Sequence, residues 1–144
     1  MRSDRGSASL EFIAAGVLLI VPLIYLVLVL GRVQAGTLAA EAVARQSARV
    51  FVTASTPALA DARVKSAVVD GLADFNFAPA EATTTVSCTP AGANCLRPEA
   101  WVTITSAVMV TLPFVPSILG LERFGHITVT GSATEQVPLG APRA

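Results

Sequence analysis

The chain has 144 residues, with 10 Lys and Arg against 10 Asp and Glu and therefore no formal net charge. This balance, together with the lack of a basic stripe interleaved with aromatic residues, argues against a nucleic-acid partner. Charged residues make up only 14 % of the chain, against roughly 25 % in ordinary soluble domains. The polar surface must therefore consist mainly of Thr, Ser, Gln and Asn.

An apolar segment without a single charge, residues 12–31, follows the short polar N-terminus. These about 20 residues would form roughly 30 Å of α-helix, which matches the hydrocarbon thickness of a bilayer. No polar stripe runs along the segment, as a helix on a soluble core would require. We therefore interpret it as a membrane span, bent at Pro22 because proline removes one backbone hydrogen bond.

Glu11 directly precedes the apolar segment. A carboxylate this close to the lipid is costly unless it has a partner. The order Arg5-Gly6-Ser7-Ala8-Ser9-Leu10-Glu11-Phe12 resembles the processing site of type IV prepilins, in the short-leader form of the tight-adherence (Flp) pilus system. The resemblance implies that a prepilin peptidase recognises Glu11 and Phe12 and cuts between Gly6 and Ser7, which removes a leader of residues 1–6. It also implies that Glu11 pairs with the Ser7 ammonium of a neighbouring subunit and so sets the stagger between subunits.

Two other interpretations of the N-terminus remain open. In the first, the helix is an uncleaved anchor and Glu11 lies at the level of the lipid head groups. In the second, Arg2 and Arg5 belong to a secretory signal peptide. The apolar segment is longer than a typical signal-peptide core, and no small-residue cleavage pattern follows it promptly, which disfavours the second interpretation.

The helical pattern continues to residue 52 with a row of small residues at intervals of four: Gly36, Ala40, Ala44 and Ala48. Such a smooth face favours close packing against another helix, from this chain or from another subunit. With the Ala-rich run at 44–49, the segment 7–52 resembles TadE-like proteins, the pseudopilin or minor-pilin components of the tight-adherence machinery. The resemblance implies a role in pilus assembly at the cytoplasmic membrane, with other pilin subunits or copies of itself as partners.

Residues 53–137 predict a small α+β head. Thr56 and Pro57 are typical of a helix start, and apolar residues at helical spacing continue to about Asn76. This amphipathic helix is expected to pack on an antiparallel sheet of three strands, at 83–87, 101–112 and 127–137. The apolar loop before Gly125 is expected to be a short helix or a hydrophobic lid, and the tail, 138–144, to be disordered.

The chain has two cysteines, Cys88 and Cys95, separated by a run dense in turn-forming residues. This spacing would let the sulfurs meet in a disulfide, which implies an oxidising compartment and places the head outside the cytoplasm. Two unrelated free thiols are the alternative. A zinc site is disfavoured because His126, the single histidine, cannot complete a four-ligand set.

The sequence carries no phosphate-binding loop, dinucleotide fingerprint, Gly-x-Ser-x-Gly elbow or His-Glu-x-x-His motif. No Ser or Asp is tied to His126 by spacing, so we predict neither an enzyme nor a bound cofactor or metal. Trp101 is expected to be an ordinary aromatic residue of the sheet or core. The predicted function is that of a TadE-like pseudopilin, and the alternative is an uncleaved, single-span membrane anchor that displays a binding module.

Overall fold

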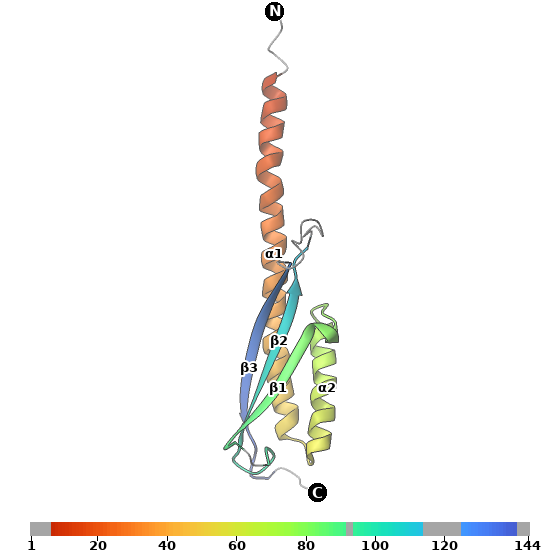
Figure 1. The fold of residues 1–144 in the computed structure, drawn as a ribbon, viewed down its shortest axis with the longest axis vertical. Helices are drawn as coiled ribbons and strands as arrows, with labels where there is room; N and C mark the ends of the chain where they lie inside the picture. The colour runs from red at the N-terminus through yellow and green to blue at the C-terminus, as the bar shows by residue number, and fades with distance from the viewer. Residues whose placement is uncertain (1–6, 92–93, 114–124, 141–144) are drawn as a thin grey trace, which may run out of the picture.

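The computed structural model describes residues 7–91, 94–113 and 125–140. A long helix, α1 (Ser7–Val52), is followed by α2 (Pro57–Ala73), a 3₁₀ turn η2 (Pro79–Glu81) and the strands β1 (Ala82–Thr89), β2 (Trp101–Thr111) and β3 (His126–Gln136). The first half of α1 extends away from every other element, whereas the second half lies along the sheet (Figure 1). The expected α+β class, with two helices and three antiparallel strands, is confirmed.

The sheet is antiparallel throughout, in the order β1-β2-β3. Its register places Ser106 of β2 opposite Thr84 of β1 and Gly131 of β3. One side of β2 is fully buried, at Val102, Ile104, Ser106, Val108 and Val110. This is the side that the alternating pattern predicted, because successive side chains of a strand point to opposite faces.

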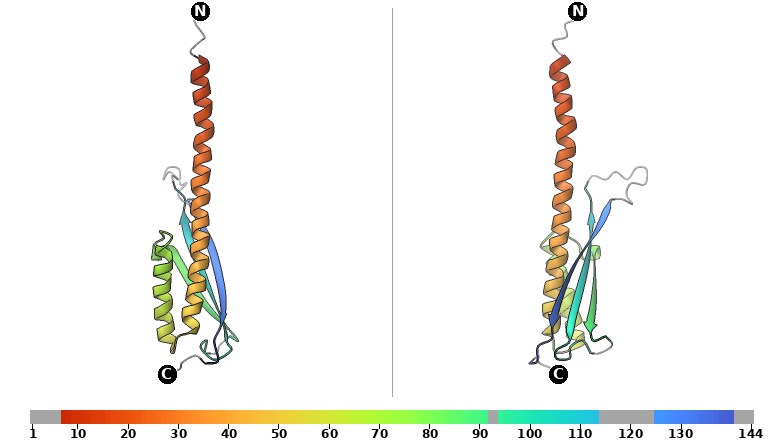
Figure 2. Two further views of the ribbon diagram at one scale, coloured as in Figure 1. Left: turned by 180° about the vertical axis from the view of Figure 1, so that it is seen from behind. Right: turned by 90° about the vertical axis from the view of Figure 1, so that its left-hand side faces the viewer.

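Both helices lie on the same face of the sheet (Figure 2). The helix that lies directly on the strands is the second half of α1, which contacts β2 and β3 extensively. α2 instead packs mainly against α1, where its Gly71 approaches Val43. The expectation that the helix after Thr56 packs on the sheet still holds, because Val64 of α2 shares a buried cluster with Ile104 of β2 and Leu72 shares another with Val108. The small residues of α1 allow its backbone to approach the strands more closely than α2 can.

The N-terminus of α2 forms as the sequence predicts. Thr56 is the N-cap, and its side-chain oxygen accepts a hydrogen bond of 3.2 Å from the backbone N–H of Leu59. Pro57 occupies the first helical position, where its missing N–H has no helical partner to lose. The helix ends at Ala73, and a turn continues to Asn76, whose positive φ of 57° is one that asparagine tolerates.

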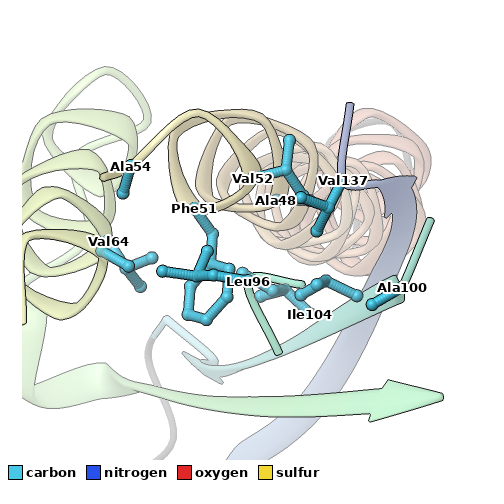
Figure 3. Close-up of a cluster of buried hydrophobic side chains, with 11 residues drawn as sticks. Ala48, Phe51, Val52, Ala54, Val64, Leu96, Ala100, Ile104 and Val137 are labelled. Carbon is cyan, nitrogen blue, oxygen red and sulfur yellow. The ribbon is translucent and has the colours of Figure 1, made fainter. Parts of the chain in front are cut away.

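Two hydrophobic clusters join the layers. The first lies near the end of α1 and the start of α2, and Figure 3 shows Phe51 of α1 between Val64 of α2 and the side chains of Leu96 and Ile104. The second lies closer to the apolar segment and contains Val43, Leu72, Phe77, Val108 and Val110. Because α1 contributes to both clusters, we define the folded unit as residues 36–52 of α1 together with α2, η2 and the sheet. The boundary expected at residue 52 thus divides elements that share one core.

Candidate functional site

The apolar side chains in the first half of α1 are not covered by the rest of the chain. Residues 9–31 are exposed almost without interruption, and burial begins at Gly36. In the part of the chain that the structure describes, this is the one helix long and apolar enough to cross a membrane. At about 1.5 Å per residue, its 46 residues extend roughly 69 Å, enough for a bilayer and for the folded unit beyond it. The helix continues through Pro22 without a break.

The residues of the prepilin-like junction lie at the free end of this helix. Gly6 lies outside the described residues, and Ser7 is the first residue of α1. Glu11 follows Ser7 by four positions in α1. Both Glu11 and Phe12 are exposed, Phe12 by 81 %. The structure therefore places these two predicted recognition residues on a surface that a peptidase or another subunit can reach.

The predicted small-residue row lies inside the folded unit. Gly36, Ala40, Ala44 and Ala48 are all buried by other parts of the same chain. A β-carbon added to Gly36 would meet the side chains of Val110 and Val129, which belong to β2 and β3. The partner expected for the row was another helix, and the structure shows the sheet instead at Gly36 and Ala40. A row of small residues permits close approach by either kind of backbone, so the spacing did not distinguish them.

Gly131 is a residue that the sequence reasoning missed. A β-carbon added to it would lie 2.5 Å from the backbone nitrogen of Glu41 and 2.6 Å from the carbonyl carbon of Ala40. Only glycine permits β3 to approach the backbone of α1 so closely. A glycine inside an alternating strand pattern is a signal for such an approach, and it could have identified α1 as the layer that covers the sheet.

Arg32 marks the end of the apolar segment and ties it to the folded unit. Its guanidinium lies 4.7 Å from the centroid of the Phe77 ring, and its Nη2 donates to the carbonyl oxygen of Asn76 at 3.4 Å. Both partners lie in the segment that follows α2. The first charged residue after the apolar segment is thus already in contact with the folded unit, and no flexible linker separates the two parts.

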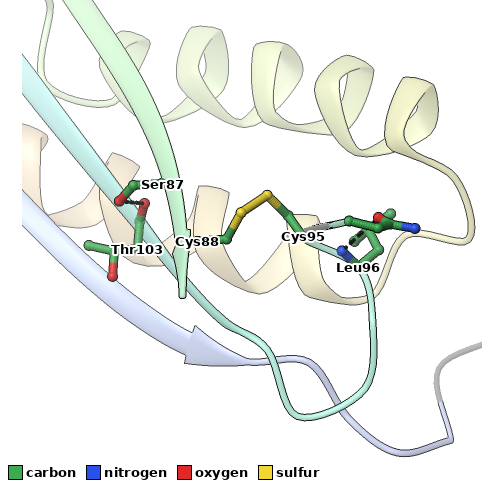
Figure 4. Close-up of a disulfide and its surroundings, with 6 residues drawn as sticks. Ser87, Cys88, Cys95, Leu96 and Thr103 are labelled. Carbon is green, nitrogen blue, oxygen red and sulfur yellow. Dashed lines mark hydrogen bonds between the residues drawn. A yellow bond between two sulfur atoms is a disulfide. The ribbon is translucent and has the colours of Figure 1, made fainter. Parts of the chain in front are cut away.

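The predicted disulfide between Cys88 and Cys95 is present, with Cα atoms 5.5 Å apart. Figure 4 shows that it joins the end of β1 to the loop that leads toward β2. In that loop, the backbone N–H of Leu96 donates to the side-chain oxygen of Asn94 at 3.1 Å. Cys95 and Leu96 both pack on the first hydrophobic cluster, so the bridge anchors the loop to the core.

The described residues show no grouping of three or more His, Cys, Asp and Glu side chains that could hold a metal ion. His126 lies exposed at the start of β3, opposite Thr111. Trp101 begins β2 and is 49 % exposed, on the side of the sheet opposite to α1 and α2. No protein-family model, curated protein or solved structure matches the chain significantly.

Proposed function

We propose that this chain is a TadE-like pseudopilin or minor pilin that acts in assembly of a tight-adherence, Flp-type pilus. The observation that carries the proposal is the form of α1. An exposed apolar half begins at a prepilin-like Gly6-Ser7 junction with Glu11 and Phe12, and the same helix continues into the core of the folded unit. One rigid helix with these two halves suits a subunit that is held in the membrane and carries a small domain outside it.

The proposed location is the cytoplasmic membrane, with a single span and the folded unit outside the cytoplasm. The exposed side chains of the apolar segment support the span, because burying them in lipid would remove a large apolar surface from water. The Cys88–Cys95 disulfide supports the orientation, because such bridges persist in oxidising compartments. Arg32 would then lie where the span leaves the lipid, and the folded unit would begin directly at the membrane surface.

Association with other subunits is proposed to use the apolar segment rather than the small-residue row. Gly36 and Ala40 are already occupied by contacts with the sheet. Gly16 and Gly31 lie in the exposed half, and a β-carbon added to either would have no neighbour within 4 Å. Helices in lipid pack closely at small residues, so these two glycines are the available points for close contact with a second helix.

The experiment that tests this proposal is the intact mass of the protein from membranes of a host that contains a prepilin peptidase. A mature chain that begins at Ser7 is the expected result. Gly6→Val should leave the longer precursor, because a side chain at the scissile peptide blocks close approach of the backbone. Gly16→Val is the matched control, since Gly16 lies beyond the junction in open space, and this variant should be cut normally.

Two other masses would overturn the proposal. A chain that keeps Met1 or Arg2 in that host would identify an uncleaved anchor with a binding module. A chain cut after the apolar segment would identify a secretory signal peptide. Either outcome would also remove the role proposed for Glu11.

A further inference from the structure

In the described part of the chain, one face of the sheet carries no helix. We define it as the outer face, and Figure 1 shows it from the front. The register assigns its side chains row by row, because residues directly opposite each other on neighbouring strands point to the same side. They are exposed or half-buried in every row. The outer face consists of Thr83, Thr85, Ser87 and Thr89 of β1, Trp101, Thr103, Thr105, Ala107, Met109 and Thr111 of β2, and His126, Thr128, Thr130, Ser132, Thr134 and Gln136 of β3.

The outer face contains no Asp, Glu, Lys or Arg. The charged residues of the folded unit lie instead mainly on the two helices, among them Arg45, Arg49, Asp61, Arg63 and Lys65. An exposed protein surface usually mixes both signs of charge. A partner that covers the outer face therefore finds no carboxylate, Lys or Arg to pair with, and charge complementarity favours an uncharged ligand.

Trp101 lies at one end of the outer face among groups that form hydrogen bonds. Thr89 and Gln136 flank it in its own cross-strand row. The next row holds Ser87, Thr103 and Thr134, and the hydroxyl oxygens of Thr103 and Thr134 are 2.8 Å apart. An exposed indole ring with hydroxyl and amide groups around it offers both a flat apolar surface and hydrogen-bond partners.

The size of the outer face argues against a stable protein partner. Strands of 8, 11 and 11 residues, about 4.8 Å apart and with about 3.3 Å per residue, cover roughly 500 Å². A stable protein interface buries about 800 Å² on each partner. A second copy of the chain seated on this face alone would therefore bind only weakly, whereas an extended, narrow ligand can use the whole length of the strands.

We propose that the outer face binds a neutral polysaccharide, with Trp101 stacking on a sugar ring and the Thr hydroxyls and the Gln136 amide bonding to sugar hydroxyls. A pyranose ring presents C–H groups on its face and hydroxyls at its rim, which suits an indole beside hydroxyl and amide groups. Each Thr hydroxyl can both donate and accept, so it matches a sugar hydroxyl in either role. This inference does not depend on leader cleavage or on pilus assembly, and it holds equally for an uncleaved anchor.

The experiment measures binding of the full chain to cellulose, chitin and amylose, in a detergent without a sugar head group. Binding to at least one of these neutral polymers is expected, and added salt should leave it unchanged because no ion pair contributes. Trp101→Ala should lower the affinity at least about tenfold, the size expected when a dominant aromatic contact is lost. Trp101→Phe should retain most of the binding, because it keeps an aromatic ring.

Two further variants separate recognition from folding. Thr103→Val keeps the shape of the side chain and removes its hydroxyl, so it should weaken binding severalfold while the disulfide and secondary structure persist. Thr53→Val, at the end of α1 and away from the outer face, is the matched control and should bind as the wild type does. Equal binding by Trp101→Ala, or no binding to any of the three polymers, would overturn the proposal. Self-association lost in Trp101→Ala without polysaccharide binding would also overturn it and assign the face to a second copy.

Discussion

Gly131 of β3 lies against the backbone of Ala40 in α1, so that a β-carbon on Gly131 would be 2.6 Å from the Ala40 carbonyl carbon. This contact holds the long helix on the sheet. Gly131→Ala should therefore force α1 and β3 apart and lower the free energy of unfolding by about 1–3 kcal/mol, the usual cost of overpacking. Thermal or denaturant unfolding of the full chain in detergent measures the change.

Gly140→Ala is the control for this prediction. A β-carbon at Gly140 has no neighbour within 4 Å, so this change should leave the unfolding transition in place. If Gly131→Ala were as stable as the wild type, the close approach of β3 to α1 would not exist in solution.

Gly36 and Gly31 test which part of α1 belongs to the folded unit. Gly36→Ala should destabilise the unit by about 1–3 kcal/mol, because the new methyl group meets Val110 and Val129. Gly31→Ala adds a methyl group in open space and should leave stability unchanged or raise it by about 0.5–1 kcal/mol through helix propensity. Parallel unfolding curves of the two variants make the comparison.

One other combination of results would place Gly36 in an interface between subunits. If Gly36→Ala unfolded like the wild type and yet reduced crosslinking between subunits, the small-residue row would pack between chains. The contacts seen here predict the reverse, with crosslinking affected first at Gly31 and Gly16.

The disulfide should contribute measurably to the stability of the folded unit. Closing a loop across a sequence separation of 7 stabilises by about 2 kcal/mol in the chain-entropy estimate, so Cys88→Ser with Cys95→Ser should lower the unfolding free energy by about that amount. Leu96 and Cys95 pack on the first cluster, so the loop is expected to loosen before the rest of the unit. Rapid thiol labelling of the untreated wild-type chain would show instead that no bridge forms.

Local patterns in the sequence predicted the local structure. The strands at β2 and β3, the cap at Thr56 and the bridge between Cys88 and Cys95 each depend on residues that are close in sequence. Alternation, capping and short loop closure act over such distances, and all of these elements are present.

The pairing of elements far apart in sequence could not be derived in the same way. The helical segments 36–52 and 57–73 both carry an apolar face, and nothing local states which of them lies on the strands. Which helix lies on the strands depends on the contact between Gly131 and the backbone of Ala40. These two residues are far apart in sequence, and neither one alone indicates its partner. The outer face was missed for a related reason, because its lack of charge appears only when three strands are aligned in register.

Glu11→Gln tests the residue on which the proposed assembly mechanism depends. The change keeps the size of the side chain and removes its charge, so the Ser7 ammonium of a neighbouring subunit would lose its partner near the membrane. Removing one partner of a buried pair commonly costs about 3–5 kcal/mol, and less here because water and lipid head groups reach this end of the helix. Insertion should be unharmed, since a neutral amide is cheaper in lipid than a carboxylate.

The measurements are membrane insertion, leader cleavage and crosslinked complexes, compared between the wild type and Glu11→Gln. Inserted and cleaved but unassembled protein is the expected outcome. Glu41→Gln is the matched control on the same helix, because Glu41 forms an exposed ion pair of 3.0 Å with Arg45 that contributes little. Full assembly of Glu11→Gln would show that Glu11 is an interfacial residue without a role in subunit register, whereas failure of both variants would point to a general effect of charge on α1.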